Sequence, residues 1–334
     1  MVIIESFTTA VVLLIITMLC WGSWANTQKL ASKSWPFQLF YWDYVIGILL
    51  CSLVLGLTMG SMGEDGRPFV DDLLQADFSS FVSAFIGGVI FNIANILLVA
   101  AIDIAGMAVA FPIGIGLALV IGVIVNYIKY PVGDPLFLFA GVFMVVVAIL
   151  MDAKAYKNIS KGDSKISRKG IVLSLSAGVL MGFFFRFVAD SMVTDNLSPE
   201  RGKFTAYGAF FVFALGIYIS NFLWNSYVMA KPFSGKPVKY KEYFLNGNLK
   251  LHSIGWLGGI IWAIGMSFSL IASEQAGFAI SYGLGQGATM VAAIWGVFVW
   301  KEFKNADGKT QRMINWMFVF FIVGLVAIIY ARLK

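Results

Sequence analysis

Long stretches of hydrophobic residues alternate along the chain with short polar segments. A helix needs about 20 apolar residues to cross the hydrocarbon core of a bilayer. Ten stretches meet this length: 7–29, 36–60, 79–102, 105–129, 134–152, 170–190, 203–230, 251–273, 277–300 and 312–331. Each is apolar on every side, whereas the strands of a membrane β-barrel would alternate between apolar and polar residues. The pattern predicts an all-α integral membrane protein with ten transmembrane helices.

Composition supports a membrane location. Of 334 residues, 59% are hydrophobic and 13% are charged, whereas soluble domains carry about 25% charged residues. So few charged side chains could not cover that much apolar surface in water. A soluble enzyme, a disulfide scaffold and a disordered chain are therefore excluded. Because no Lys or Arg precedes the first stretch, we expect a retained span there rather than a cleaved signal peptide.

The basic residues predict the orientation of the helices. Loops after odd-numbered spans carry 17 of the 24 Lys and Arg residues, and the opposite side carries six. Basic residues concentrate in cytoplasmic loops, so we expect these loops in the cytoplasm and both termini outside, in the plasma (inner) membrane. Binding of lipid or of a partner is the alternative role for the basic loops. Nucleic acid is not an expected partner, because the positive charge is confined to short loops.

Two segments of the chain match each other without a gap at an offset of 171 residues. The match pairs Gly87-Gly88 with Gly258-Gly259, Asp103 with Glu274, Ala105-Gly106 with Ala276-Gly277, and Gly114 and Gly116 with Gly285 and Gly287. The chain is therefore predicted to form two five-helix repeats, 1–152 and 170–334, joined by a basic cytoplasmic linker at 153–169. Since five is odd, the second repeat enters the membrane inverted relative to the first. Inverted repeats are typical of alternating-access transporters, which bind substrate near the midplane; a duplication kept only for packing is the alternative.

Several short motifs resemble those of one transporter family. They are Cys20-Trp21-Gly22-Ser23-Trp24, Tyr41-Trp42-Asp43-Tyr44, Gly87-Gly88, Gln275-Ala276-Gly277-Phe278-Ala279, Trp295-Gly296 and Lys301-Glu302-Phe303. Together they resemble the ureide permease family over nearly the whole chain, apart from 153–169, which is much longer in plant members. More distantly, the chain is similar to glucose/ribose porters and the rhamnose–proton symporter. All are ten-helix members of the drug/metabolite transporter superfamily, so the resemblance implies that fold.

The resemblance implies a secondary active transporter that imports a small neutral polar metabolite together with protons. A ureide or nucleobase such as allantoin or uracil is favoured, a ribose- or glucose-type sugar is the alternative, and a metabolite exporter is the second alternative. The expected partners are this substrate, a proton or sodium as coupling ion, and the lipid bilayer. A monomer of ten helices suffices to enclose a pathway, and an oligomer is left open.

The titratable residues do not indicate an enzyme. His252 is the one histidine of the chain. With scattered carboxylates it cannot supply the clustered acid–base or metal-binding groups that catalysis in the membrane requires. We therefore expect no enzymatic activity, no bound metal and no cofactor.

Charged side chains inside a span are costly, so each is a candidate for proton coupling or gating. Asp43 lies seven residues into the second predicted helix, where aromatic neighbours would exclude water from a proton-coupling carboxylate; permanent pairing with a cation is the alternative. Arg186 and Asp190 are four residues apart, which predicts an ion pair on one helix face. A change of partner by Arg186 between transport states is the functional alternative. Plant ureide permeases carry a carboxylate where this chain has Ala110-Phe111-Pro112, so no coupling role transfers there.

A neutral substrate is expected to be recognised by amides, hydroxyls and aromatic faces. Amide side chains would be unpaired in lipid, so the helix faces that carry them should point inward. The candidates are Trp21, Trp24 and Gln28 on the first span, Asn92 and Asn95 on the third, Asn221 and Asn225 on the seventh, Trp262 on the eighth, and Tyr282, Gln286 and Thr289 on the ninth. Pairing between helices is the alternative role for each amide, and core packing is the alternative for Trp262. Asp103 and Glu274 begin matching turns and are predicted to cap the helices that follow.

Overall fold

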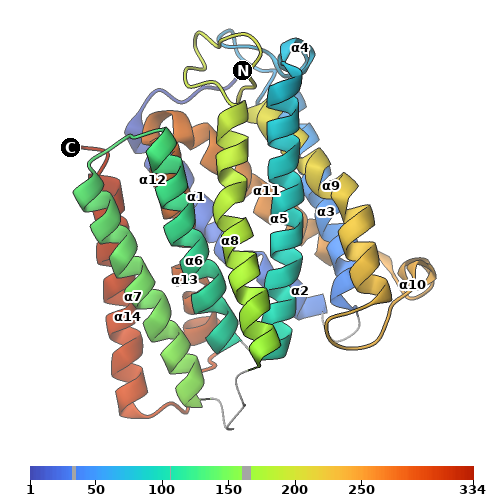
Figure 1. Cartoon of the computed structure of the whole chain (residues 1–334), viewed down its shortest axis with the longest axis vertical. Coiled ribbons are helices and arrows are strands. Elements are labelled where there is room, and N and C mark those ends of the chain that lie inside the picture. Colours follow the sequence, from blue (N-terminus) through green and yellow to red (C-terminus); the bar gives the residue numbers. More distant parts are fainter. Residues whose placement is uncertain (32–34, 106, 160–166) are drawn as a thin grey trace.

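A computed structural model describes residues 1–31, 35–105, 107–159 and 167–334. In these residues, ten helical segments are long and apolar enough to cross a membrane, which confirms the predicted all-α membrane fold. They are α1 (Phe7–Ser23) with α2 (Ala25–Ala31), α3 (Phe37–Leu57), α5 (Phe78–Ala105), α6 (Met107–Lys129), α7 (Pro135–Ile159), α8 (Arg168–Ser191), α9 (Ala206–Ala230), α11 (Leu249–Ala276), α12 (Phe278–Gly285) with α13 (Ala288–Ile294) and η1 (Trp295–Val299), and α14 (Gly308–Tyr330). Figure 1 shows them side by side in one bundle, with both termini near the same end.

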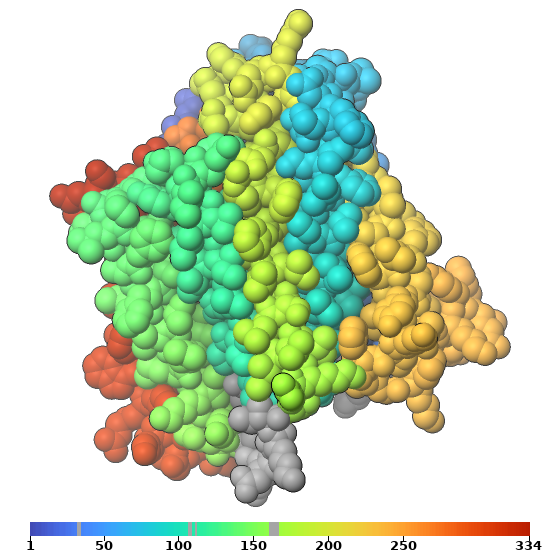
Figure 2. Space-filling view, viewed as in Figure 1, coloured from blue at the N-terminus to red at the C-terminus, as the bar shows by residue number. Residues whose placement is uncertain are grey.

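The two ends of the bundle are named here by what they carry. The terminal side is the end at which α1 begins and α14 ends, and the basic side is the end at which α7 ends and α8 begins. Two short helices that the hydropathy pattern did not predict lie in the connecting loops: α4 (Phe69–Gln75) on the terminal side and α10 (Tyr240–Leu245) on the basic side. Figure 2 shows α10 standing out from the flank of the bundle. The predicted linker 153–169 is helical up to Ile159, and its residues 160–166 lie outside the described residues.

Two of the spans are broken inside the bundle. A turn at Trp24 separates α1 from α2 in the first, and a turn at Gln286 and Gly287 separates α12 from α13 in the ninth. The break in the ninth span falls among Gly283, Gly285 and Gly287, residues without side chains that leave a helix less tightly held. The matching run in the fourth span behaves differently, because α6 stays helical through Pro112, Gly114 and Gly116; Gly106 lies outside the described residues.

Glycines allow α3 and α11 to cross in backbone contact. A Cβ atom added at Gly259 would lie 2.0 Å from the carbonyl oxygen of Tyr44, and one added at Gly47 would lie 2.4 Å from that of Trp256. These separations are far below a van der Waals contact, so any larger residue would push the helices apart. A helix of each predicted repeat is thus held directly against a helix of the other.

The crossing of α5 and α9 has the same construction. A Cβ atom at Gly88 would lie 2.1 Å from the carbonyl oxygen of Phe213, and one at Gly216 would lie 2.2 Å from that of Phe85. In both crossings each glycine meets the carbonyl of the residue three positions before the opposing glycine. This likeness is compatible with the predicted repeat.

We expect the alanine variant of Gly259 to be destabilised by about 1–3 kcal/mol, the usual effect of overpacking in a close-packed interior. The apparent thermal unfolding temperature in detergent should therefore fall. Gly308 is the matched control, because it begins α14 and a Cβ atom added there meets no described atom within 4 Å. Equal unfolding temperatures for G259A and G308A would contradict the close crossing.

Candidate functional site

A cavity of about 550 Å³ extends from the middle of the bundle to the basic side. Its walls come from both predicted repeats, and both broken spans contribute to them. The lining residues are Trp21, Gly22, Trp24, Ala25, Asn26, Gln28, Lys29, Phe91, Asn95, Leu98, Val99, Ile102, Asp103, Ile115, Asp152, Tyr156, Met181, Phe184, Trp262, Gln286, Ala288, Thr289, Ala292, Ala293, Trp295, Gly296, Trp300 and Glu302. The volume is in the range of sites for small molecules, about 300–1,000 Å³.

Aromatic rings form the deep end of the cavity. The rings of Trp21 and Trp262 are stacked, with centroids 5.9 Å apart and planes 11° apart. The ring of Phe91 lies 4.5 Å from that of Trp262, and Trp262 is halfway along α11. The acidic and basic residues that line the cavity lie instead towards its mouth on the basic side. The deep end therefore suits a flat, uncharged molecule.

Amide and hydroxyl groups are placed beside these rings. Gln286 stands at the break between α12 and α13, and the hydroxyl of Thr289 donates to its carbonyl oxygen (3.0 Å). On the opposite wall, the Asn95 amide donates to the hydroxyl of Tyr41 (3.3 Å). Because Gln286 and Asn95 each carry both donor and acceptor atoms, they complement a ring that has N–H and C=O groups.

The cavity brings together most of the residues predicted to contact substrate. Those that line it are Trp21, Trp24, Gln28, Asn95, Trp262, Gln286 and Thr289. The other four, Asn92, Asn221, Asn225 and Tyr282, are buried between helices away from the lining. A role in binding stays a prediction for all eleven.

The four buried residues mostly join helices. Asn92 accepts from the Tyr41 hydroxyl (2.9 Å) and donates to the hydroxyl of Ser220 (2.9 Å), which ties α5 to α3 and α9. The Asn225 amide donates to the carbonyl oxygen of Gln38 (2.9 Å). Asn221 differs, because both of its amide atoms are buried without a hydrogen-bond partner in the described part of the chain.

Charged residues surround the mouth of the cavity, and their role there was not predicted. Lys29 pairs with Glu302 (2.8 Å), which also accepts from the Tyr156 hydroxyl (2.7 Å). Asp103 accepts from the hydroxyl of Ser234 (3.2 Å), and Asp152 lies on the same wall as Tyr156, one helical turn earlier. In the sequence, Glu302 belongs to the motif Lys301-Glu302-Phe303, whereas Asp152 is the last residue of the predicted span 134–152.

Asp43 lies in a separate cluster outside the cavity lining. Its carboxylate accepts from Trp35 Nε1 (3.1 Å) and the Tyr243 hydroxyl (2.5 Å), and it pairs with Nδ1 of His252 (2.9 Å). Gly255 leaves the space for this approach, since a Cβ atom there would lie 2.3 Å from that of Asp43. Burial and the neighbouring carboxylate raise the pKa of the Tyr243 phenol, which therefore stays protonated and donates. The cluster fastens α10 to α3 and α11, and coupling by Asp43 stays a prediction.

Arg186 and Asp190 form the expected ion pair at the terminal end of α8. Asp190 also accepts from the Tyr130 hydroxyl (3.1 Å), and the guanidinium lies over the Tyr130 ring, 5.6 Å from its centroid. The pair therefore joins α8 to the end of α6. Its role in coupling or gating stays a prediction.

Buried hydrogen bonds close the bundle between the cavity and the terminal side. The Tyr282 hydroxyl donates to the carbonyl oxygens of Met181 (3.0 Å) and Ala118 (3.3 Å), which joins α12 to α8 and α6. The Thr17 hydroxyl donates to the carbonyl oxygen of Gly265 (2.9 Å), which joins α1 to α11. The cavity is thus open towards the basic side and closed towards the terminal side.

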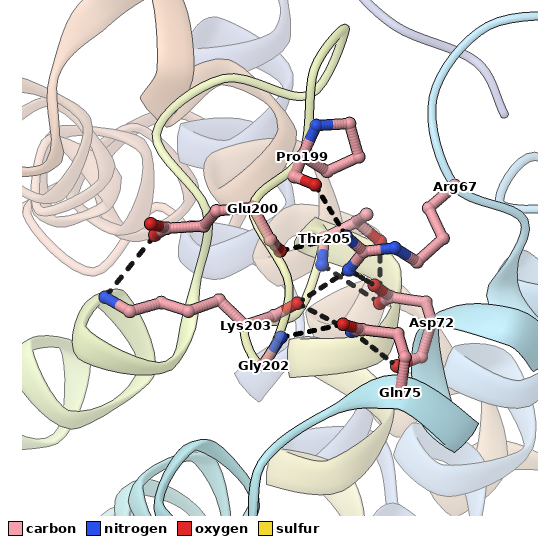
Figure 3. A network of polar contacts seen from close by, with 8 residues as sticks. All are labelled: Arg67, Asp72, Gln75, Pro199, Glu200, Gly202, Lys203 and Thr205. Carbon is pink, nitrogen blue, oxygen red and sulfur yellow. Dashed lines mark hydrogen bonds and ion pairs between the residues drawn. The ribbon is translucent and has the colours of Figure 1, made fainter.

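A polar network on the terminal side joins the segment around α4 to the loop between α8 and α9 (Figure 3). Arg67 donates to the carbonyl oxygens of Pro199 (2.6 Å), Glu200 (2.8 Å) and Lys203 (2.9 Å), and it pairs with Asp72 (3.1 Å). One guanidinium therefore holds a whole loop of the second predicted repeat to the first.

Two further side chains complete this network (Figure 3). Asp72 accepts from the backbone N–H (2.9 Å) and the hydroxyl (3.0 Å) of Thr205. Gln75 accepts from the N–H of Gly202 (2.8 Å) and donates to the carbonyl oxygen of Lys203 (2.9 Å). The loop is thus bonded mainly through its backbone.

Glu274 also belongs to the terminal side, and its predicted role as a helix cap is wrong. It accepts from the backbone N–H (3.2 Å) and the side-chain amide (2.5 Å) of Asn196. The N-cap of α12 is Gly277, to which no side chain donates or accepts a capping bond. Asp103, which the repeat pairs with Glu274, lies within α5 and accepts from Ser234. Its predicted role as a cap of α6 stays a prediction, because Gly106 lies outside the described residues.

The chain resembles proteins of known family over almost its full length. The family model for ureide permease matches residues 40–168 and 154–331. Ureide permease 1 of Arabidopsis thaliana is 22% identical over 97% of this chain and 97% of its own length. The glucose uptake protein GlcU of Bacillus subtilis is 23% identical over 75% of this chain and 76% of its own length. A solved crystal structure, 15% identical, covers 98% of this chain with a TM-score of 0.58 and so shares its fold.

Asp72, within the network of Figure 3, makes that side of the protein sensitive to pH. Its side chain is fully buried. Burial raises the pKa of its carboxyl to about 6, and the bonds from Thr205 and Arg67 lower it only in part. The folded protein therefore binds this proton more tightly than the unfolded chain does. The stabilisation is complete below pH 4 and is lost as the pH rises through about 6.

We expect the free energy of unfolding of the wild type to lose on the order of 2–3 kcal/mol from this group between pH 4 and pH 7. The variant Asp72→Asn should lack that part of the pH dependence, because it carries no ionisable group. Thermal unfolding in detergent across this range measures the difference. Asp71→Asn, an exposed neighbour on α4, serves as control and should keep the wild-type slope; equal slopes for D72N and wild type would contradict the assignment.

Proposed function

Because the chain belongs to the ureide permease family, we propose that this multi-pass membrane transporter moves a small, flat, neutral molecule of the ureide or nucleobase class. The observation that carries the proposal is the uncharged aromatic and amide surface at the deep end of the cavity, with the charged residues kept at its mouth. The relatives named ureide permease support this substrate class, and the relative named glucose uptake protein makes a sugar the second candidate.

The position of this surface suits alternating access. The offset of 171 residues relates Phe91 to Trp262 and Ile115 to Gln286, and all four residues line the cavity. Residues related by a two-fold axis can touch each other only close to that axis, and Phe91 and Trp262 are in ring contact at 4.5 Å. A substrate bound there lies where the two repeats meet. The bound substrate would keep its contacts with both repeats while the cavity closes on the basic side and opens on the terminal side.

The same proposal gives a direction and a driving ion. The structure is open on the basic side, which the distribution of Lys and Arg predicts to face the cytoplasm. Import would therefore end in this state, with the network around Arg67 closed behind the substrate. The family resemblance and the carboxylates that line the cavity support coupling to protons.

Uptake into proteoliposomes tests the function. Radiolabelled allantoin and uracil should enter faster than into protein-free vesicles, and a pH gradient with the interior alkaline should concentrate them. A facilitator would equilibrate its substrate and never concentrate it. Glucose, ribose and rhamnose form the sugar arm; transport of a sugar with no uptake of allantoin or uracil would replace the first candidate by the second.

A pair of amide variants tests the position of the binding surface. Gln286→Ala should raise the KM for the transported compound about five- to tenfold, the effect of losing about one hydrogen bond, with little change in unfolding temperature. Asn92→Ala removes an amide that joins three helices without lining the cavity. It should lower the unfolding temperature and leave the KM of the folded fraction unchanged. The reverse result would place the binding surface elsewhere.

A further inference from the structure

Asp152 is a carboxylate within the membrane-spanning part of α7 that lines the cavity near its mouth. It lies seven residues before the helix ends at Ile159. Its Oδ1 atom is buried and has no hydrogen-bond partner in the part of the chain that the structure describes. An ionised carboxylate that is buried without a partner is strongly disfavoured, and protonation removes that cost.

The other acidic residues around the basic side accept hydrogen bonds wherever the structure describes them. Glu302 has Lys29 and Tyr156, and Asp103 has Ser234. Asp43 has three donors and lies outside the lining. Asp152 thus combines access to the cavity with the lack of a bonded partner among the described residues.

The charges that face Asp152 favour a neutral state. Tyr156, one turn after Asp152 on α7, donates to Glu302 (2.7 Å) and so holds a second carboxylate on the same side of the cavity, where it repels a charge on Asp152. Lys29, a cation of the same cavity lining, is bonded to Glu302. With Asp152 protonated, Lys29 and Glu302 balance each other; when the proton leaves, one negative charge remains.

The helices packed against α7 add no other close acid. On α14, Lys309 and Arg312 are exposed near its start. On α6, the described titratable residues Tyr127 and Lys129 lie at the terminal end, far from Asp152. The protonation of Asp152 is therefore controlled mainly by the cavity and by the pair of Lys29 and Glu302.

We propose that Asp152 is the carboxyl group that binds and releases the coupled proton during transport, an inference that rests on the proposed function. In the open state described here, water in the cavity can take the proton from the carboxyl and leave a carboxylate. Closure of the basic side would remove that water. A protonated carboxyl tolerates closure, whereas the unpartnered carboxylate resists it, so the switch between states is tied to the proton.

The variant Asp152→Asn tests this, because its amide resembles the protonated carboxyl permanently. In proteoliposomes loaded with unlabelled allantoin, exchange for labelled allantoin should continue at a rate within about twofold of wild type. Accumulation driven by a pH gradient, about tenfold per pH unit for one proton in the wild type, should fall to equilibration. Unchanged accumulation by D152N would overturn the proposal, and so would loss of exchange and accumulation together.

Two matched variants separate Asp152 from other acids. Asp71→Asn, exposed on the terminal side, should keep both exchange and accumulation. Asp43→Asn tests the competing coupling residue, which lies outside the cavity lining. Loss of accumulation with exchange intact in D43N, and not in D152N, would overturn the proposal and transfer the role to Asp43.

A second measurement does not depend on the substrate. The infrared difference spectrum of the purified wild type between high and low pH should contain a carboxyl C=O band that is absent from D152N and present in D71N. If no tested compound is transported, the proposed function fails while this band still decides whether Asp152 binds a proton. An identical carboxyl band in D152N would overturn the assignment.

Discussion

Backbone contact between crossing helices determines where the other parts of this protein can lie. At Gly47 and Gly259, and again at Gly88 and Gly216, a helix carbonyl occupies the space that a side chain would need. These contacts interleave the two predicted repeats rather than setting them side by side. They bring Phe91 and Trp262 into ring contact at the centre, and the cavity begins where this aromatic layer ends. Binding surface and helix packing therefore share one geometric origin.

Most of the fold was predictable, because a membrane span is a property of about 20 residues at once. Hydropathy over that length located all ten spans, even though α7 continues seven residues beyond its predicted end. The short helices α4 and α10 were not predicted, because six or seven residues show too little hydrophobic periodicity to indicate a helix. The break at Gln286 lies among glycines, whereas the break at Trp24 has no comparable glycine run beside it.

The candidate site was predictable where it depends on one helix face and unpredictable where it depends on contacts between distant segments. For example, Trp21, Trp24 and Gln28 lie on one face of the first span, and all three line the cavity. By contrast, Asp43 bonds to His252, which is 209 residues away in the sequence. No pattern within either helix predicts that contact. The position of Asp152 was not predictable for a related reason: a carboxylate at the border of a predicted span is typical of the start of a loop. Asp152 lies inside the membrane-spanning helix because α7 continues to Ile159, seven residues beyond it.

The way in which Arg67 holds its loop has a consequence for how this protein can vary. Three of its four partners are backbone carbonyl groups, of Pro199, Glu200 and Lys203, and every residue type provides a carbonyl. The guanidinium therefore recognises the path of the loop and not its side chains. Substitutions in this segment would leave the carbonyl oxygens in place and so preserve the bonds to Arg67. An inserted or deleted residue would move the carbonyl oxygens out of reach of the guanidinium. Loop length, rather than loop composition, is the quantity that this contact holds constant.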